Sequence, residues 1–173
     1  VSFAFSLTVL PLYFVHSGAP PDSNVLTRIL LGSLGLISLL VFSAAWGQII
    51  TDTASDRPWL SAVTTTPLVI LIGLTFVHFS FEAGTVISTL GPVDPTREGV
   101  LAPAQFLLQG ALGRLLSLAF LAGSAIAIMT AGFLPRWLAR AAVVAAVVQA
   151  CFVPSMYFAP NPSDFYGAVG WGA

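Results

Sequence analysis

The hydrophobic positions of this chain form long uninterrupted runs, and short connections rich in proline, aspartate and glycine separate them. An α-helix needs about 20 mostly apolar residues to cross the hydrocarbon of a bilayer. The pattern therefore predicts an all-α, polytopic membrane helix bundle with about five transmembrane helices. We expect these helices at residues 1–15, 25–50, 59–90, 103–131 and 135–158.

Both ends of the chain depart from this regular pattern. The run 1–15 is short for a span and begins with Val1, so we expect the first helix to be truncated, tilted or missing its beginning. The tail 160–173 resembles the capped start of another apolar segment, and we expect a sixth helix to be missing at the C-terminus. The whole chain, 1–173, is interpreted as one transmembrane bundle.

The composition narrows the class of protein. Hydrophobic residues make up 57% of the chain, charged residues only 8%, and the mean hydropathy is +0.93, whereas about 25% of the residues in soluble domains are charged. The absence of lysine excludes a retinal or pyridoxal Schiff base. The single cysteine, Cys151, excludes an internal disulfide and a thiolate metal cage. The scattered arginines form no basic stripe for nucleic acid.

The segment GFLPRWLAR, residues 132–140, predicts the orientation of the bundle. Gly132 is expected to end one helix and Pro135 to open the next, with Trp137 at the membrane interface. Arg136 and Arg140 have no acidic residue beside them. Because loops rich in arginine stay in the cytoplasm, we place this turn inside the cell and the connection 91–99 outside. The predicted location is the cell inner membrane.

The candidate site begins with His78 and Glu82 in FVHFSFE, residues 76–82. Four residues apart on a helix, they share one face, and ionisable groups inside a span are costly enough to suggest function. Counting inward at about 1.5 Å per residue places Arg114 level with His78, and Gln109 close to Glu82. Gln149 falls near the same depth. These five side chains are predicted to converge in the outer half of the bundle.

Two interpretations of this cluster stay open. In one, Glu82 and Arg114 form an ion pair, and the other polar side chains hydrogen-bond between helices. In the other, Glu82 accepts protons or anchors a ligand, Arg114 binds an anionic head group and His78 exchanges protons near neutral pH. Both predict that Arg114 faces the bundle. His78 and Glu82 supply two ligands, fewer than the three of a catalytic zinc, so no metal is predicted. No cofactor is indicated.

Two resemblances add to these expectations. The segments LPRWLARAAVVAAVV (134–148), VLTRILLGSLG (25–35) and FYGAVGWGA (165–173) resemble a group of actinobacterial multi-pass membrane proteins of unknown function. That likeness implies an inner-membrane bundle of about six helices. HFSFEAG (78–84) resembles the His-x-x-x-Glu-x-Gly helix of emopamil-binding-protein-type sterol isomerases, which implies that His78 and Glu82 handle protons.

The functional hypotheses follow from short connections, small-residue helix faces and an incomplete catalytic set. Small residues let helices approach closely in membranes, and they recur at Gly32, Gly35, Ala44 and Ala45 and among the alanines of 135–158. We expect a non-enzymatic membrane protein, either an accessory subunit of a larger complex or a small transporter-like binder. The alternative is an intramembrane lipid- or isoprenoid-modifying enzyme with His78 and Glu82 as catalytic residues. Its expected partners are membrane lipids and other membrane subunits.

Overall fold

The computed structural model describes residues 20–89, 93–95 and 102–157, and throughout these ranges the regular structure is helical. The elements, in order, are α2 (Asp22–Thr53), α3 (Trp59–Ser88), α4 (Ala102–Leu107), the π-helical η2 (Leu108–Leu112), α5 (Gly113–Ala131), α6 (Arg136–Phe152) and the 3₁₀-helical η3 (Val153–Tyr157). The prediction of an all-α fold is confirmed.

Three helical segments are long and apolar enough to cross a membrane: α2, α3 and the continuous stretch Leu108–Ala131. The predicted helix 103–131 is interrupted by the π-helical turn. The predicted helix 135–158 corresponds to α6, which has 17 residues, followed by η3. The run 1–15 and the tail 160–173 lie outside the described residues. The structure thus fits a membrane protein, while a count of about five spans stays a prediction.

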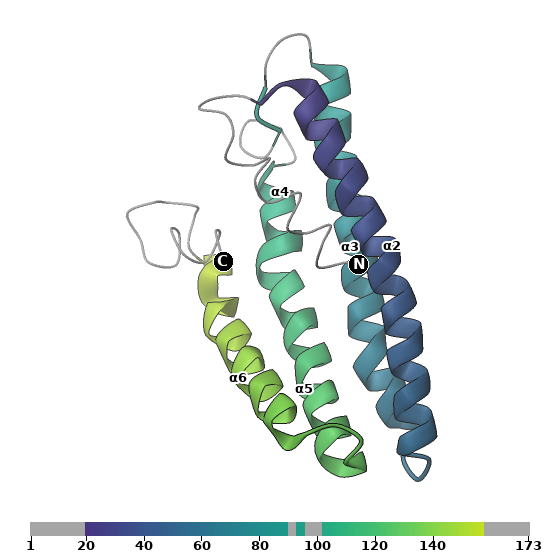
Figure 1. Ribbon diagram of the computed structural model, residues 1–173. Helices are drawn as coiled ribbons and strands as arrows, with labels where there is room; N and C mark the ends of the chain where they lie inside the picture. The colour runs from purple at the N-terminus through teal and green to yellow at the C-terminus, as the bar shows by residue number, and fades with distance from the viewer. Residues whose placement is uncertain (1–19, 90–92, 96–101, 158–173) are drawn as a thin grey trace.

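The long helices run up and down beside one another (Figure 1). α3 packs against α2 on one side and α5 on the other, and α6 packs against α5. Because successive helices are antiparallel, the α2–α3 turn and the α5–α6 turn lie at the same end of the bundle (Figure 1). Gly132 ends α5 as predicted, with a left-handed φ of 68° and its N–H donating to the Ile128 carbonyl at 3.0 Å. α6 then begins after Pro135.

Glycines permit the close contacts between the long helices. A Cβ on Gly123 of α5 would lie 2.6 Å from Thr64 Oγ1 and 3.1 Å from the Thr64 Cα of α3. At Gly47 of α2, a Cβ would lie 3.2 Å from Ser61 Oγ, and that hydroxyl donates to the Gly47 carbonyl at 2.8 Å. Hydrogen bonds of this kind across close-packed helices stabilise membrane bundles.

The predicted small-residue faces are used in part. Gly32 packs under the ring of Phe79 from α3, which would lie 2.7 Å from an added Cβ. Ala146 of α6 is buried. Ala44 and Ala45, by contrast, are exposed.

The apolar core of the described residues lies near the two turns. Ile50, Ala54, Leu60 and Ala127 are buried together there. Beside them, the Trp46 indole N–H donates to the Ser124 hydroxyl at 3.1 Å and so connects α2 with α5. Many large apolar side chains elsewhere on the helices are exposed, including Leu30, Val41, Ile87 and Val144. Such a surface suits contact with lipid rather than water.

Candidate functional site

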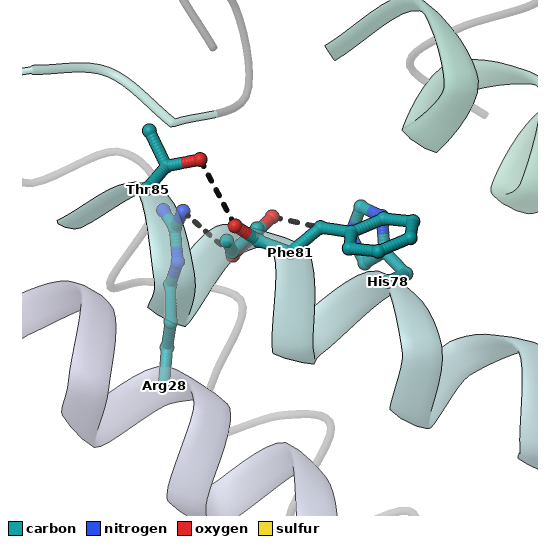
Figure 2. Close-up of polar contacts among 5 residues, drawn as sticks. Arg28, His78, Phe81 and Thr85 are labelled. Atoms are coloured by element: carbon teal, nitrogen blue, oxygen red, sulfur yellow. Dashed lines mark hydrogen bonds and ion pairs between the residues drawn. The ribbon is translucent and has the colours of Figure 1, made fainter. Parts of the chain in front are cut away.

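The Glu82 carboxylate is completely buried, and each of its oxygens faces a basic side chain. Arg28 Nη2, from α2, donates to Glu82 Oε2 at 3.1 Å, and Arg28 itself is only 3% exposed. His78 Nε2, one turn earlier on α3, lies 3.1 Å from Glu82 Oε1. Figure 2 shows Arg28 reaching from α2 toward α3, on which His78 lies. The three side chains form a compact cluster, named here the Arg28–His78–Glu82 cluster.

The sequence positions explain why Arg28 meets Glu82. Arg28 lies six residues after the first residue of α2, and Glu82 lies six residues before the last residue of α3. Because the two helices are antiparallel and each rises about 1.5 Å per residue, both side chains sit about 9 Å inside the same end of the hairpin. The predicted shared face of His78 and Glu82 is confirmed by the contact between them.

The two contacts of Glu82 differ in kind. The Arg28 contact is a hydrogen-bonded ion pair, which is the stronger type of polar interaction. The His78 ring nitrogen is equally close to the carboxylate, but Glu82 Oε1 receives no aligned hydrogen bond. His78 Nδ1 is also buried without a hydrogen-bond partner among the described residues.

Aromatic packing closes the cluster on the side nearer the bundle centre. Gly32 lies one turn after Arg28 on α2, and the Phe79 ring fills the space beside it. The rings of His78 and Phe79 are 5.9 Å apart and tilted by 47°. On the same helix, the Thr85 hydroxyl donates to the Phe81 carbonyl at 2.9 Å (Figure 2). The polar groups around Glu82 are thus held by neighbouring protein atoms.

Arg114 faces the bundle, as predicted, and it contacts two side chains of α6. It is 8% exposed, its Nη1 donates to Gln149 Oε1 at 3.5 Å, and its guanidinium carbon lies 5.2 Å from the centre of the Phe152 ring. The predicted pairing of Arg114 with Glu82 is therefore wrong, because Arg28 occupies the carboxylate from the other side of α3. The expected proximity of Gln149 to Arg114 is confirmed.

The π-helical turn just before Arg114 contributes to this outcome. The Gly113 N–H approaches both the Gly110 and the Leu108 carbonyls. A π turn inserts one extra residue and so rotates the following side chains by about 100° relative to a regular helix. Counting along an uninterrupted helix therefore gives the depth of Arg114 but not the direction in which it points.

Of the two glutamines in this segment, the one predicted to lie in the site is exposed, and the other is buried. Gln109, predicted to lie close to Glu82, is exposed, so the predicted convergence of five side chains is wrong at this position too. Gln105, which the site prediction did not include, is 2% exposed, and neither its Nε2 nor its Oε1 has a hydrogen-bond partner among the described residues.

The predicted single pocket is thus two separate groups of side chains. One lies between α2 and α3 and contains Arg28, His78 and Glu82. The other lies between α5 and α6 and contains Arg114, Gln149 and Phe152. In the ranges that the structure describes, no three His, Cys, Asp or Glu side chains come together as a metal site.

Comparison with protein-family models, curated proteins and solved structures finds no match. The two resemblances noted in the sequence therefore stay predictions.

Proposed function

We propose that this chain is a non-enzymatic integral membrane protein that serves as an accessory subunit of a larger membrane complex. The observation that supports this most directly is the burial of Glu82, at 0% exposure, with Arg28 bonded to one oxygen and His78 beside the other. A carboxylate in this position stabilises the contact of α2 with α3. It presents no open surface to a substrate.

The outer face of α3 supports the assignment to a complex. Gly73, Ser80 and Gly84 are exposed and lie at intervals of seven and four residues, which aligns them on one side of the helix. A Cβ added at Gly73 or at Gly84 would meet nothing within 4 Å. Membrane helices place small residues of this kind where another helix packs against them. A helix of a partner subunit would cover this face.

The charges at the two ends of the bundle support the proposed orientation. Arg57, in the α2–α3 turn, lies at the same end as Arg136 and Arg140 (Figure 1). Arg57 contacts Asp56 at 3.3 Å, and Arg136 and Arg140 are exposed. Arginine-rich short loops favour the cytoplasmic side. The proposal places both turns in the cytoplasm, with the protein in the cell inner membrane, as the actinobacterial resemblance implies.

The alternative, an intramembrane enzyme acting on a lipid or isoprenoid, rests on His78, whose side chain is 13% exposed. In that case His78 and Glu82 would handle protons, as the sterol-isomerase resemblance implies. The buried Arg28–Glu82 ion pair favours the subunit proposal, because proton exchange at Glu82 would first require that pair to separate.

Native mass measurement after gentle detergent extraction from the source membrane tests the proposal. We expect the wild-type chain to travel with other membrane proteins. Gly84→Leu should release it, because a leucine would fill the space where the partner helix packs. The control is Ala45→Leu, which introduces the same side chain at an exposed position of α2. A wild-type chain that is strictly monomeric and turns over lipid, with the turnover lost in Glu82→Gln, would overturn the proposal in favour of the enzyme.

A further inference from the structure

A second polar region lies between α2 and α3, toward the end of the bundle that holds the α2–α3 turn. It is an open groove of about 340 Å³. Its lining residues on both helices are Leu40, Ser43, Ala44, Gly47, Gln48, Thr51, Ser61, Thr65 and Val69. A volume of this size is typical of small-ligand sites and is too small for a whole helix.

The groove extends from the turn into the apolar part of the bundle. Ser61 is the third residue of α3, and Val69 lies eight residues further along. At about 1.5 Å per residue the lining of α3 covers about 12 Å. Ser61 and Thr65 thus lie close to the turn, near the exposed Trp59 and the expected depth of lipid head groups, while Ser43, Leu40 and Val69 lie deeper. An occupant with a polar head and an apolar tail fits this gradient.

The hydroxyls in the groove already donate to backbone carbonyls, so they favour an occupant that donates hydrogen bonds. The hydroxyls of Thr51 and Ser61 both donate to the Gly47 carbonyl, at 2.9 and 2.8 Å, and the Thr65 hydroxyl donates to the Ser61 carbonyl at 2.9 Å. Since each hydroxyl has a single hydrogen, these three oxygens can offer only lone pairs to an occupant. Gln48 uses one of the two hydrogens on its Nε2 to donate to Asp52 at 2.8 Å, and its Oε1 is a further acceptor. The groove is therefore rich in acceptors.

A buried hydroxyl supplies an independent observation. Ser43 lines the groove, is 1% exposed, and its Oγ has no hydrogen-bond partner among the described residues. Several other serines and threonines of these helices donate to a carbonyl one turn earlier, as Ser38 does to Leu34 at 3.0 Å. A buried polar group without a partner costs free energy unless a ligand or water satisfies it.

We propose that this groove binds the uncharged, hydroxyl-rich head group of a membrane glycolipid. Sugar hydroxyls donate hydrogen bonds to the acceptors from Thr51, Ser61 and Thr65, and one of them can pair with Ser43. None of the described residues that line the groove carries a charge, so an anionic phosphate finds no cation there and faces mostly acceptor oxygens. The proposal is independent of the role of the Arg28–His78–Glu82 cluster and of the accessory-subunit function.

The experiment uses the full chain in phosphatidylcholine nanodiscs that contain equal minor amounts of monoglucosyl diacylglycerol, phosphatidylethanolamine and phosphatidylglycerol. Native mass spectrometry then identifies the lipid that stays bound after release. We expect the glucolipid to be retained in preference to the other three. Retention of phosphatidylglycerol or phosphatidylethanolamine instead, or of no lipid in preference, would overturn the proposal.

Two pairs of variants locate the binding. Ala44→Leu fills the groove, and its control, Ala45→Leu, adds the same bulk at the adjacent exposed position outside it. Ala44→Leu should lower glucolipid retention by about tenfold or more, and Ala45→Leu should leave it unchanged. Thr65→Val removes one acceptor while keeping the shape, and retention should fall about threefold, whereas Thr66→Val should have no effect. Equal retention within either pair contradicts a site in this groove.

Discussion

The two ends of the α2–α3 hairpin differ in how their polar side chains are satisfied: one end has a buried ion pair, and the other has an open groove lined by hydroxyls. At the end away from the α2–α3 turn, named here the outer end of the hairpin, Arg28 and Glu82 form an ion pair and are buried at 3% and 0% exposure. At the turn end, the groove is lined by uncharged hydroxyls and is open. Charges in an apolar region need a partner with a fixed geometry, whereas hydroxyls can satisfy their hydrogen on their own helix and still accept a bond. The first arrangement suits a fixed contact between helices, and the second suits an exchangeable ligand.

The largest expected effect comes from removing one charge at the outer end. Arg28→Leu leaves Glu82 buried without its ion-pair partner, and a broken buried pair costs about 3–5 kcal/mol of unfolding free energy. The double variant with Glu82→Leu should be clearly more stable than Arg28→Leu alone, because no buried carboxylate is stranded. The free energy of unfolding of the single and double variants is measured in mixed micelles with increasing amounts of a denaturing detergent. Two effects that simply add would contradict the coupling.

Pairing Glu82→Leu with a change at Arg114 gives the control for the double variant of Arg28 and Glu82. Its described contacts are an amide and an aromatic ring on α6, and the contacts of Glu82 are on α2 and α3. Arg114→Leu and Glu82→Leu should therefore add to within about 0.5 kcal/mol in the same unfolding assay. A coupling between them comparable to that of Arg28 with Glu82 would show that the two clusters act as one site.

Glycine-to-alanine changes test how tightly the helices pack at the two ends, and their expected effects on stability are smaller. Alanine gains about 0.5–1 kcal/mol over glycine inside a helix, and this gain should appear undiminished at Gly73, which has open space around it. At Gly47 the new Cβ meets Ser61 and Thr65 atoms at 3.2 Å, so the net effect should be close to zero. At Gly32 it meets the Phe79 ring at 2.7 Å, and we expect a net destabilisation of about 1 kcal/mol. Thermal unfolding of the three purified variants gives the order, and any other order contradicts the tighter packing of the outer end.

The smallest expected effect concerns the hydrogen bond from Trp46 to Ser124, beside the core near the turns. Ser124→Ala removes the acceptor and should cost about 0.6 kcal/mol, the average for polar contacts between membrane helices. Trp46→Phe removes the donor and part of the stacking on Phe42, whose ring centre is 5.9 Å away. The double variant should cost no more than Trp46→Phe alone. A further loss of stability in the double variant would indicate that Ser124 has another role.

The sequence was sufficient for the features that depend on one helix at a time. Helix class, the turn at Gly132 and Pro135, and the shared face of His78 and Glu82 follow from hydropathy and from spacing, and the structure confirms them. The inward direction of Arg114 was also predictable, because an arginine exposed to lipid would be costly.

The choice of partners between helices was harder to predict. The residue pattern does not identify Arg28 as the partner of Glu82, although both residues lie equally far from the outer end of the hairpin once α2 and α3 are paired. The positions of Gln109 and Arg114 were assigned by counting along a regular helix, and no residue pattern signals the π turn that lies between them. Which neighbour a side chain meets depends on helix rotation, and spacing along one helix leaves that rotation undetermined.

The π turn Leu108–Leu112 divides this span into two stretches whose periodicities are out of phase. Side chains before the turn and side chains after it can therefore each keep an apolar stripe, but the two stripes follow different lines along the helix surface. An insertion or deletion of one residue in the turn changes the phase of one stretch while the other stays in register. The segment α4 and the helix α5 can thus change their facing neighbours independently of each other, even though they form one continuous rod.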